Sequence, residues 1–201
     1  MRAGQGSLRS KYVIKVIQMF QVALGPFSLL VHRGPLPGIY SSYREHALLS
    51  EEFDLDKIDG EACMIAVCRN GDRPFLVVAQ RFEPCVAGFD PGALIVPETG
   101  LLFIGAGTRL LAYSLSPLKR LWEDTADVGF WSWRQHGQFV LMSAECELAA
   151  WDTSGKKLWT MSVEPPWSYR VDGERVFLDT ASGNFTIPIC DGREKQAQSK
   201  G

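Results

Sequence analysis

The stretch LAAWDTSGKKLW, from Leu148 to Trp159, decides the fold that we expect for this chain. Two short apolar runs, Leu148–Trp151 and Lys157–Val163, enclose a segment that contains Asp, Ser and Gly. Neither run is long enough for a typical helix, and Asp, Ser and Gly are residues that turns prefer. The stretch therefore predicts two β-strands joined by a turn.

The same pattern recurs along the chain at a nearly constant interval. Residues 102–123 (LFIGAGTRLLAYSLSPLKRLWE) align with residues 140–160 (VLMSAECELAAWDTSGKKLWT), and the alignment continues downstream. The aligned pairs are Leu110 with Leu148, Tyr113 with Trp151, Trp122 with Trp159 after one gap, Gly137 with Gly173, and Val140 with Val176. A period of about 36 to 38 residues is typical of propellers and other repeated sheets, since one small sheet cannot cover its own apolar faces.

Short apolar runs punctuated by Gly, Pro, Asp and Ser occupy most of the chain. Runs at roughly 8–12-residue spacing are typical of sandwiches, barrels and propellers. Besides the two runs named above, we predict strands at Tyr12–Ile17, Phe27–Val31, Ala62–Cys68, Phe75–Gln80, Ala93–Val96, Leu101–Ile104, Leu110–Leu115, Gln138–Met142, Arg175–Leu178 and Phe185–Ile189. We therefore expect an all-β protein, propeller-like or built from another repeated antiparallel sheet.

The segment Leu148–Trp159 also resembles the repeat unit of quinoprotein-type (PQQ-like) β-propellers. In that unit a strand ends in an apolar–Asp pair, and a Ser/Thr-Gly turn, a Lys and Leu-Trp follow. The resemblance extends over about residues 100–180 and implies that Asp152 and Gly155 close the hairpin and that Trp159 packs between blades. The preceding copy departs from the pattern, with Ser114 and Pro117 in place of the Asp and the Gly. The resemblance implies the packing of the repeat only, and no cofactor.

The N-terminal third of the chain departs from this pattern. Residues 40–53 (YSSYREHALLSEEF) predict one short helix, since Tyr43 and Ala47 fall at helical spacing. The final residues contain almost no apolar side chain and indicate a disordered tail. The expected organisation is a flexible leader (1–10), a single β-rich domain (11–190, with repeat-like units within 61–190) and a disordered tail (191–201).

Charge and cysteine content restrict the partners that we expect. The net charge of −2 gives no support for nucleic-acid binding, and no apolar run reaches the roughly 18 residues of a membrane span. Five cysteines without a dense framework indicate reduced thiols and a cytoplasmic location. An acidic run is either a solvated loop or helix start, or a docking patch for a basic partner. It comprises Glu51, Glu52, Asp54, Asp56, Asp59 and Glu61.

The sequence contains no coherent catalytic, metal or cofactor motif. Gly105–Leu110 (GAGTRL) lacks the third Gly and the helix of a dinucleotide fingerprint and indicates a hairpin turn. Asp54–Gly60 has the wrong register for a calcium loop. The histidines lie far apart, and Cys63 and Cys68 lack the spacing of a zinc ribbon. We therefore assign no catalytic, metal or cofactor-binding residue and favour a protein that is not an enzyme.

All six tryptophans lie within residues 122–167. They either fill the core between sheets, since each buries a large area, or line an exposed groove, since Trp and Tyr dominate binding hot spots. In the second interpretation neighbouring acidic residues form a rim around the groove. The partner-binding residues that this interpretation predicts are Glu123, Asp124, Asp127, Trp131, Trp133, Glu164, Trp167 and Tyr169.

These patterns predict a cytoplasmic, non-enzymatic module that binds another protein, one with a basic surface, through a Trp-rich, acid-rimmed surface. One version is an immunity protein that neutralises a basic nuclease-type toxin, an analogy at the level of protein class. The alternative is a small-molecule binding protein or enzyme in which a carbohydrate or cofactor stacks on Trp131 or Trp167. A third possibility is a scaffold subunit whose aromatic side chains are buried in an oligomer interface.

Overall fold

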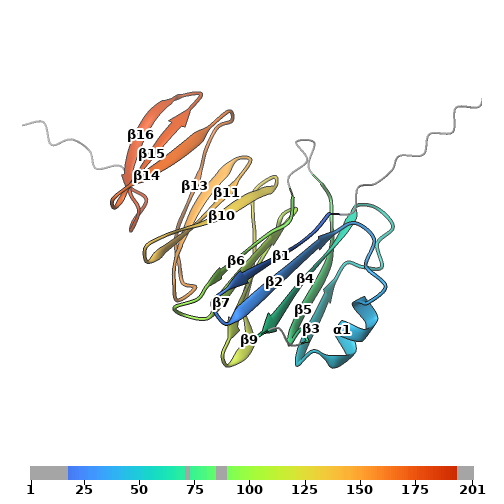
Figure 1. Cartoon of the computed structure of the whole chain (residues 1–201). Coiled ribbons are helices and arrows are strands. Elements are labelled where there is room, and N and C mark those ends of the chain that lie inside the picture. Colours follow the sequence, from blue (N-terminus) through green and yellow to red (C-terminus); the bar gives the residue numbers. More distant parts are fainter. Residues whose placement is uncertain (1–17, 71–72, 85–89, 194–201) are drawn as a thin grey trace, which may run out of the picture.

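The computed structural model describes residues 18–70, 73–84 and 90–193, which form four β-sheets stacked in chain order (Figure 1). We call them blades A to D. The predicted leader, the predicted strand at Tyr12–Ile17 and most of the predicted tail lie outside the described residues. The division of the chain into leader, domain and tail therefore stays a prediction. Within the described residues, no helix is long and apolar enough to cross a membrane.

Blade A differs from the other blades in its connectivity. Its strands follow the order β1 (Gln18–Leu24), β2 (Phe27–Arg33), β4 (Glu61–Arg69), β5 (Leu76–Phe82) and β3 (Leu49–Phe53). All neighbours in this order are antiparallel except β3, which pairs in parallel with β5. The helix α1 (Tyr40–His46) covers one face of the sheet, where Tyr40 packs with Met64 and Val77. The other face packs on blade B.

The predicted helix at residues 40–53 is correct only in its first half. The chain leaves helical geometry at Ala47, and residues 49–53 form β3 instead. The side chains of β3 alternate: the Glu52 carboxylate accepts hydrogen bonds from Tyr40 and Arg44 of α1, whereas the Glu51 carboxylate accepts one from Tyr113 of blade B. A strand can serve both neighbours because its side chains point to opposite faces in turn, and this tertiary pairing overrides the local helical pattern.

Blades B and C are antiparallel four-stranded meanders in simple chain order. Blade B comprises β6 (Gly92–Val96), β7 (Leu101–Ala106), β8 (Arg109–Leu115) and β9 (Leu118–Thr125), and blade C comprises β10 (Phe130–His136), β11 (Phe139–Ala144), β12 (Glu147–Asp152) and β13 (Lys157–Ser162). Blade D has β14 (Ser168–Asp172), β15 (Arg175–Thr180) and β16 (Gly183–Pro188). The predicted all-β, propeller-like fold of repeated antiparallel sheets is confirmed.

The repeat that the sequence predicts appears in the pairing of the strands. Trp122 pairs with Ala112 across β8 and β9, and Trp159 pairs with Ala150 across β12 and β13. Gly137 and Gly173 occupy equivalent turns with the same φ of 56°. Besides β3, the strands β1, β9, β10 and β14 were not predicted. In β9 and β14 charged side chains lie between half-buried residues, and in β10 Ser, Arg and Gln interrupt the aromatic side chains, so none of the three has the continuous apolar run of a middle strand.

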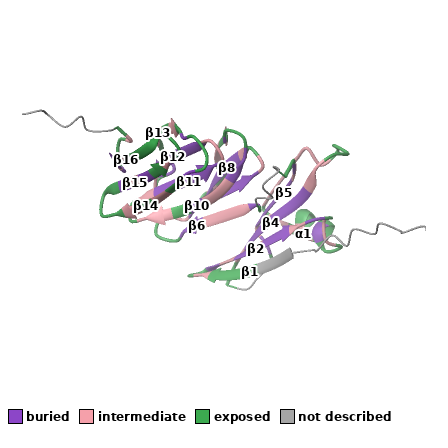
Figure 2. Ribbon diagram, turned by 90° about the horizontal axis from the view of Figure 1, so that it is seen from above, coloured by how far each residue is buried: buried purple, intermediate pink, exposed green. Residues whose placement is uncertain are grey.

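Separate apolar layers lie between successive blades. One joins blades A and B, a second joins B and C, and a third joins C and D. Figure 2 shows that the middle strands β8, β11 and β12 are almost entirely buried, whereas the residues of the outer strand β13 are either exposed or half-buried. The outer strands and the turns at the strand ends therefore supply the surface on which a binding site can be built.

Candidate binding site

The tryptophans gather at two blade junctions rather than in one exposed groove. Trp122, Trp133 and Trp151 lie between blades B and C, where the Trp122 and Trp151 rings stack at 5.6 Å and Trp133 meets Trp151 edge-on at 5.2 Å. The other three, Trp131, Trp159 and Trp167, lie between blades C and D. Each of the six is buried or half-buried. Most of the surface of these rings is therefore buried, as expected for tryptophans that fill the core between sheets.

Indole N–H groups hold neighbouring blades together. The Trp122 Nε1 of blade B donates to the Gly155 carbonyl of blade C at 2.7 Å, and the Trp159 Nε1 of blade C donates to the Ile189 carbonyl of blade D at 2.8 Å. Each indole lies against a glycine: a Cβ on Gly192 would stand 2.5 Å from the Trp159 ring. Trp159 therefore packs between blades, as the resemblance to propeller repeats implied.

The turn after Trp151 closes as the resemblance implied. The Asp152 Oδ1 accepts hydrogen bonds from the backbone N–H groups of Ser154 (2.9 Å) and Lys156 (3.0 Å), and Gly155 adopts a φ of 85°. Although burial raises the pKa of the Asp152 carboxyl, the hydrogen bonds from Ser154 and Lys156 lower it below its usual value. The GAGTRL segment likewise forms a hairpin turn, with Gly107 at a φ of 59° between β7 and β8.

The predicted partner-binding residues separate into buried aromatics and accessible acids. Trp133 and Trp167 are each 8% exposed, and Trp131 and Tyr169 are half-buried. The Trp131 and Trp167 rings stack at 5.2 Å, and burial raises the pKa of the Tyr169 hydroxyl. The predicted acids are more accessible, since Asp124 is half-buried and three are exposed: Glu123, Asp127 and Glu164. The structure therefore places Trp133 between blades B and C and the other three aromatics between blades C and D. Glu123 and Asp124 line one cleft, Glu164 lines another, and Asp127 lines neither.

The larger cleft, of about 1170 Å³, lies at strand ends and turns of blades A, B and C. We call it the acidic cleft. Seven carboxylates line it: Asp54, Asp56, Asp59, Glu83, Glu123, Asp124 and Glu145. Three basic side chains line it: Lys57, Arg81 and Arg109. Asp54, Asp56 and Asp59 come from the loop after β3, and Glu123 and Asp124 come from the end of β9. The fold thus brings the acidic run near residue 56 beside the predicted rim residues Glu123 and Asp124.

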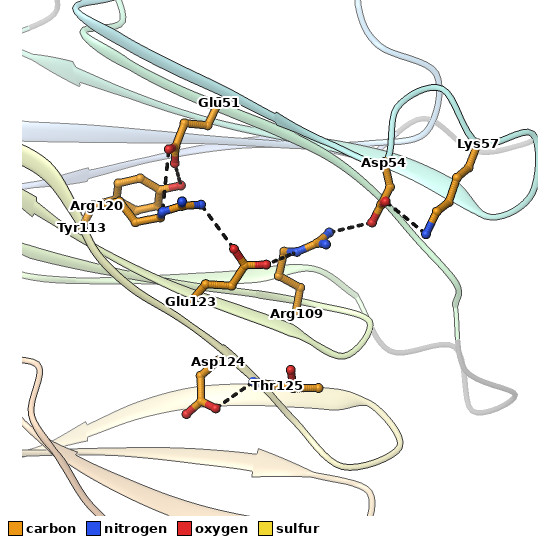
Figure 3. A network of polar contacts seen from close by, with 9 residues as sticks. All are labelled: Glu51, Asp54, Lys57, Arg109, Tyr113, Arg120, Glu123, Asp124 and Thr125. Atoms are coloured by element: carbon orange, nitrogen blue, oxygen red, sulfur yellow. Dashed lines mark hydrogen bonds and ion pairs between the residues drawn. The ribbon is translucent and has the colours of Figure 1, made fainter.

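A chain of ion pairs ties blade A to blade B at the edge of this cleft (Figure 3). Arg109 contacts Asp54 and Glu123, each at 2.9 Å, and Arg120 contacts Glu123 at 3.3 Å. Arg120 also lies 3.7 Å from Glu51, whose carboxylate accepts the Tyr113 hydroxyl at 2.5 Å. Lys57 and Arg109 hold the pKa of Asp54 below its usual value. The basic side chain of Arg109 is therefore engaged within the protein.

Four carboxylates of the acidic cleft form no ion pair among the described residues. They are Asp56, Asp59, Glu83 and Glu145, and the first three are exposed. By contrast, Asp54, Glu123 and Asp124 each pair with a basic side chain of the protein. The cleft therefore keeps an excess of negative charge that the described residues do not neutralise.

Two exposed apolar side chains stand among these charges. Ile58 is 94% exposed and Val128 is 51% exposed, and both line the acidic cleft. Val128 has a φ of 67° in a turn where the Gly129 N–H donates to the Asp127 carbonyl at 2.9 Å. A β-branched residue at positive φ is a strained arrangement. The buried Glu147 carboxylate accepts the Asp127 N–H at 2.7 Å and so holds this turn in place.

The smaller cleft, of about 570 Å³, lies between blades C and D, and we call it the apolar cleft. Its apolar lining includes Met161, Val163, Leu178 and Phe185, and the predicted partner-binding residue Glu164 also lines it. Cys146 in the β11–β12 turn forms part of the wall. Within residues 18–70, 73–84 and 90–193, no group of His, Cys, Asp or Glu side chains is placed to hold a metal ion.

Sequence reasoning found the acids of the acidic cleft but not their assembly. It named Asp54, Asp56 and Asp59 as a docking patch or a solvated loop, and it named Glu123 and Asp124 as part of an aromatic surface. It did not identify Glu83, Glu145 or Val128, which come from three separate loops. The parallel pairing of β3 with β5 brings the loop after β3 beside Glu83, and the stacking of blades B and C adds Val128 and Glu145. No local pattern in the sequence encodes either arrangement.

Comparison with known proteins shows resemblance in fold only. No protein-family model and no curated protein matches the chain. Similar solved structures include BamB from Moraxella catarrhalis (13% identity, 90% of this chain and 48% of that chain, TM-score 0.47) and the β-propeller domain of the Trilobed protease from Pyrococcus furiosus (11% identity, 90% and 57%, TM-score 0.49). Hsv2 from Kluyveromyces lactis matches over 54% of this chain and 37% of that chain (11% identity, TM-score 0.32).

The chain spans little more than half, or less, of the length of these structures. At such low identity they bear on the fold alone.

Proposed function

We propose that the chain is a non-enzymatic, cytoplasmic binding module that takes a basic segment of a partner protein into the acidic cleft. The observation that carries this proposal is the set of four carboxylates, Asp56, Asp59, Glu83 and Glu145, that line the cleft without an ion pair among the described residues. Charged side chains of one sign in a cleft focus the electrostatic field and steer an oppositely charged partner toward it.

The ion-pair chain supports the proposal because it keeps the cleft rigid while leaving its charge in excess. Arg109 and Arg120 also lie over the Phe53 ring, at 4.8 Å and 5.4 Å from its centroid. The two guanidinium groups are therefore held by carboxylates and an aromatic face together. A preformed site loses less conformational entropy when a partner binds.

The proposal moves the recognition surface that the sequence predicted from the indoles to the acids. Trp133 and Trp167 present little surface, and three indole N–H groups donate to backbone carbonyls within the protein. The acids Glu123 and Asp124 keep their place in the site, since both line the acidic cleft. Under this proposal, Trp131 and Tyr169 pack between blades C and D and support the surface rather than form it.

A charge-neutralised variant with a matched control tests the proposal. The probe is a fluorescein-labelled peptide of six Lys-Ser repeats, titrated with the chain and followed by fluorescence anisotropy at two salt concentrations. We expect Asp56→Asn/Asp59→Asn to weaken binding about fivefold to tenfold and to flatten the salt dependence. The control Asp172→Asn/Glu174→Gln removes two exposed acids at the turn between β14 and β15, and neither acid lines a cleft. An equal loss in both variants, or none in either, contradicts the proposal.

The immunity protein predicted from the sequence is one case of this function. A basic nuclease-type toxin presents the charge that the acidic cleft would complement. Co-expression with the product of the adjacent gene tests this case: protection from toxicity that Asp56→Asn/Asp59→Asn abolishes supports it, and absence of protection removes it.

Small-molecule binding is a second candidate function, and the volume of the apolar cleft favours it. Its volume of about 570 Å³ lies within the range of ligand pockets, and its lining combines apolar walls with a few polar groups. A ligand that binds only the folded chain raises its melting temperature. A metabolite panel that produces no such shift contradicts this candidate.

A further inference from the structure

The acidic cleft and the apolar cleft are neighbours along one edge of the stack. Glu145 lines the first and Cys146 lines the second, and these are consecutive residues of the β11–β12 turn. The Glu145 backbone N–H donates to the Gly129 carbonyl at 3.0 Å, and its carbonyl accepts the Trp167 Nε1 at 2.8 Å. The dividing wall is therefore a single turn, bonded on one side to the Val128 loop and on the other to the start of blade D.

The two clefts occupy equivalent positions in successive repeats. The acidic cleft is lined by the end of β9, with Asp124 and Thr125, and the apolar cleft by the end of β13, with Met161 and Ser162. The offset matches the one that places Trp122 on Trp159. The same structural position is therefore acidic in one repeat and apolar in the next, and one edge of the molecule changes from charged to apolar.

The negative field of the acidic cleft extends to the dividing wall. Partial burial, together with the carboxylates of Asp127 and Glu145, raises the pKa of the Cys146 thiol. The exposed Glu164 also lines the apolar cleft, one residue after Val163, whose N–H donates to the Cys146 carbonyl at 3.0 Å. A segment lying in the apolar cleft thus has the carboxylates of Glu145 and Glu164 near its apolar contacts.

We propose that the two clefts form one continuous site for an extended segment of a partner protein, in which basic residues lie in the acidic cleft and an adjoining large apolar side chain fills the apolar cleft. This inference rests on the proposed function and specifies the partner. The charge of the first cleft selects the basic residues, and the Met161, Leu178 and Phe185 walls of the second select the apolar one. The shared Glu145–Cys146 turn requires the two parts to be adjacent in the partner.

Four peptides and the Cys146 thiol test the inference. The first peptide has six Lys-Ser repeats, the second and third add Leu-Leu to its N-terminus and its C-terminus, and the fourth carries Leu-Leu on a neutral Gly-Ser chain. Binding is measured by fluorescence anisotropy. Iodoacetamide labelling of Cys146 is followed by peptide mass spectrometry with and without each peptide. The exposed Cys190, which lines neither cleft, is the internal control.

We expect one of the basic Leu-Leu peptides to bind at least tenfold more tightly than the basic peptide, because burial of a leucine side chain adds that factor. We expect it to slow the labelling of Cys146 several-fold and to leave Cys190 unchanged. Equal affinity of the basic peptides with no protection of Cys146 overturns the inference while the proposed function stands. Failure of every basic peptide to bind overturns both. Tight binding of the neutral peptide overturns the coupling between the clefts and favours a separate small-ligand site.

Discussion

The junction between blades C and D and the outer edge between blades A and B are closed by different means. Between C and D, Trp131, Trp159 and Trp167 fill the space, and two of the three donate indole N–H groups to the opposite blade. At the outer edge between A and B, Arg109 and Arg120 bridge carboxylates from both blades. Where indoles close a junction, the N–H groups of Trp159 and Trp167 are hydrogen-bonded inside the protein. Where ion pairs close it, charged groups remain beside solvent. The tryptophans therefore hold the blades together, whereas the charged groups remain beside solvent, where a partner can reach them.

Removal of a central indole should have the largest effect on stability. Trp151 is 1% exposed and contacts both Trp122 and Trp133. We expect Trp151→Ala to lower the free energy of unfolding by about 3–5 kcal/mol, since it leaves a large cavity between blades. Urea denaturation followed by circular dichroism measures this. A loss below about 1 kcal/mol would show that the indoles do not hold blades B and C together.

The variants Gly192→Ala and Gly173→Ala compare a glycine that lies against an indole with a glycine in an open turn. Gly192 and Gly173 both have positive φ, at 65° and 56°, but only Gly192 lies against an indole. We expect Gly192→Ala to cost about 2–3 kcal/mol, because the new methyl group collides with Trp159. Gly173→Ala should cost only about 1 kcal/mol, from backbone strain. Equal melting temperatures for the two variants would contradict the claim that close packing of Gly192 against Trp159 stabilises the junction of blades C and D.

The indole hydrogen bonds can be tested without removing the rings. Trp122→Phe keeps an aromatic ring between blades B and C but leaves the Gly155 carbonyl without its 2.7 Å donor. We expect a loss of about 1–2 kcal/mol in the free energy of unfolding, from the broken bond and the smaller ring. Trp159→Phe, which removes the equivalent bond to Ile189, should behave alike. If only one variant is destabilised, the two junctions are not equivalent.

The smallest effect concerns the turn after Trp151 and depends on pH. Because the pKa of Asp152 is lowered in the folded chain, its charge stabilises the fold above the unfolded pKa of about 4. This contribution is lost as the pH falls through the folded pKa. We expect Asp152→Asn to cost about 0.5–1 kcal/mol at pH 7 and nothing near pH 2. A difference from wild type that grows on acidification would reverse the sign and contradict the assignment.

The sequence predicted the repeat well because its signals are local. The run Leu148–Trp151, the Asp152 turn and the Trp159 position lie within one hairpin, and the alignment with Trp122 follows from the period. Strands such as β9 and β14 escaped prediction because these edge strands mix exposed charged residues with half-buried ones. The segment 49–53 escaped because its strand character depends on β5 and blade B, which are distant in the sequence.

The candidate site was predictable in its residue types but not in its arrangement. Acids dominate both the run around Asp56 and the Glu123–Asp124 pair, and that chemistry is visible in the sequence. Their convergence depends on the order of strands in blade A, which no periodicity specifies. The burial of Trp133 and Trp167 follows from blade stacking, which the composition alone does not distinguish from an aromatic groove.

Amide hydrogen exchange with the Lys-Ser repeat peptide bound is the most direct test of the claim that charge in the acidic cleft carries recognition. The account predicts that the peptide slows exchange in residues 54–60, 107–109 and 123–129, which border the acidic cleft, and leaves residues 168–180 of blade D unchanged. Protection concentrated around Trp167 and Tyr169, with no change near Asp56, would contradict it.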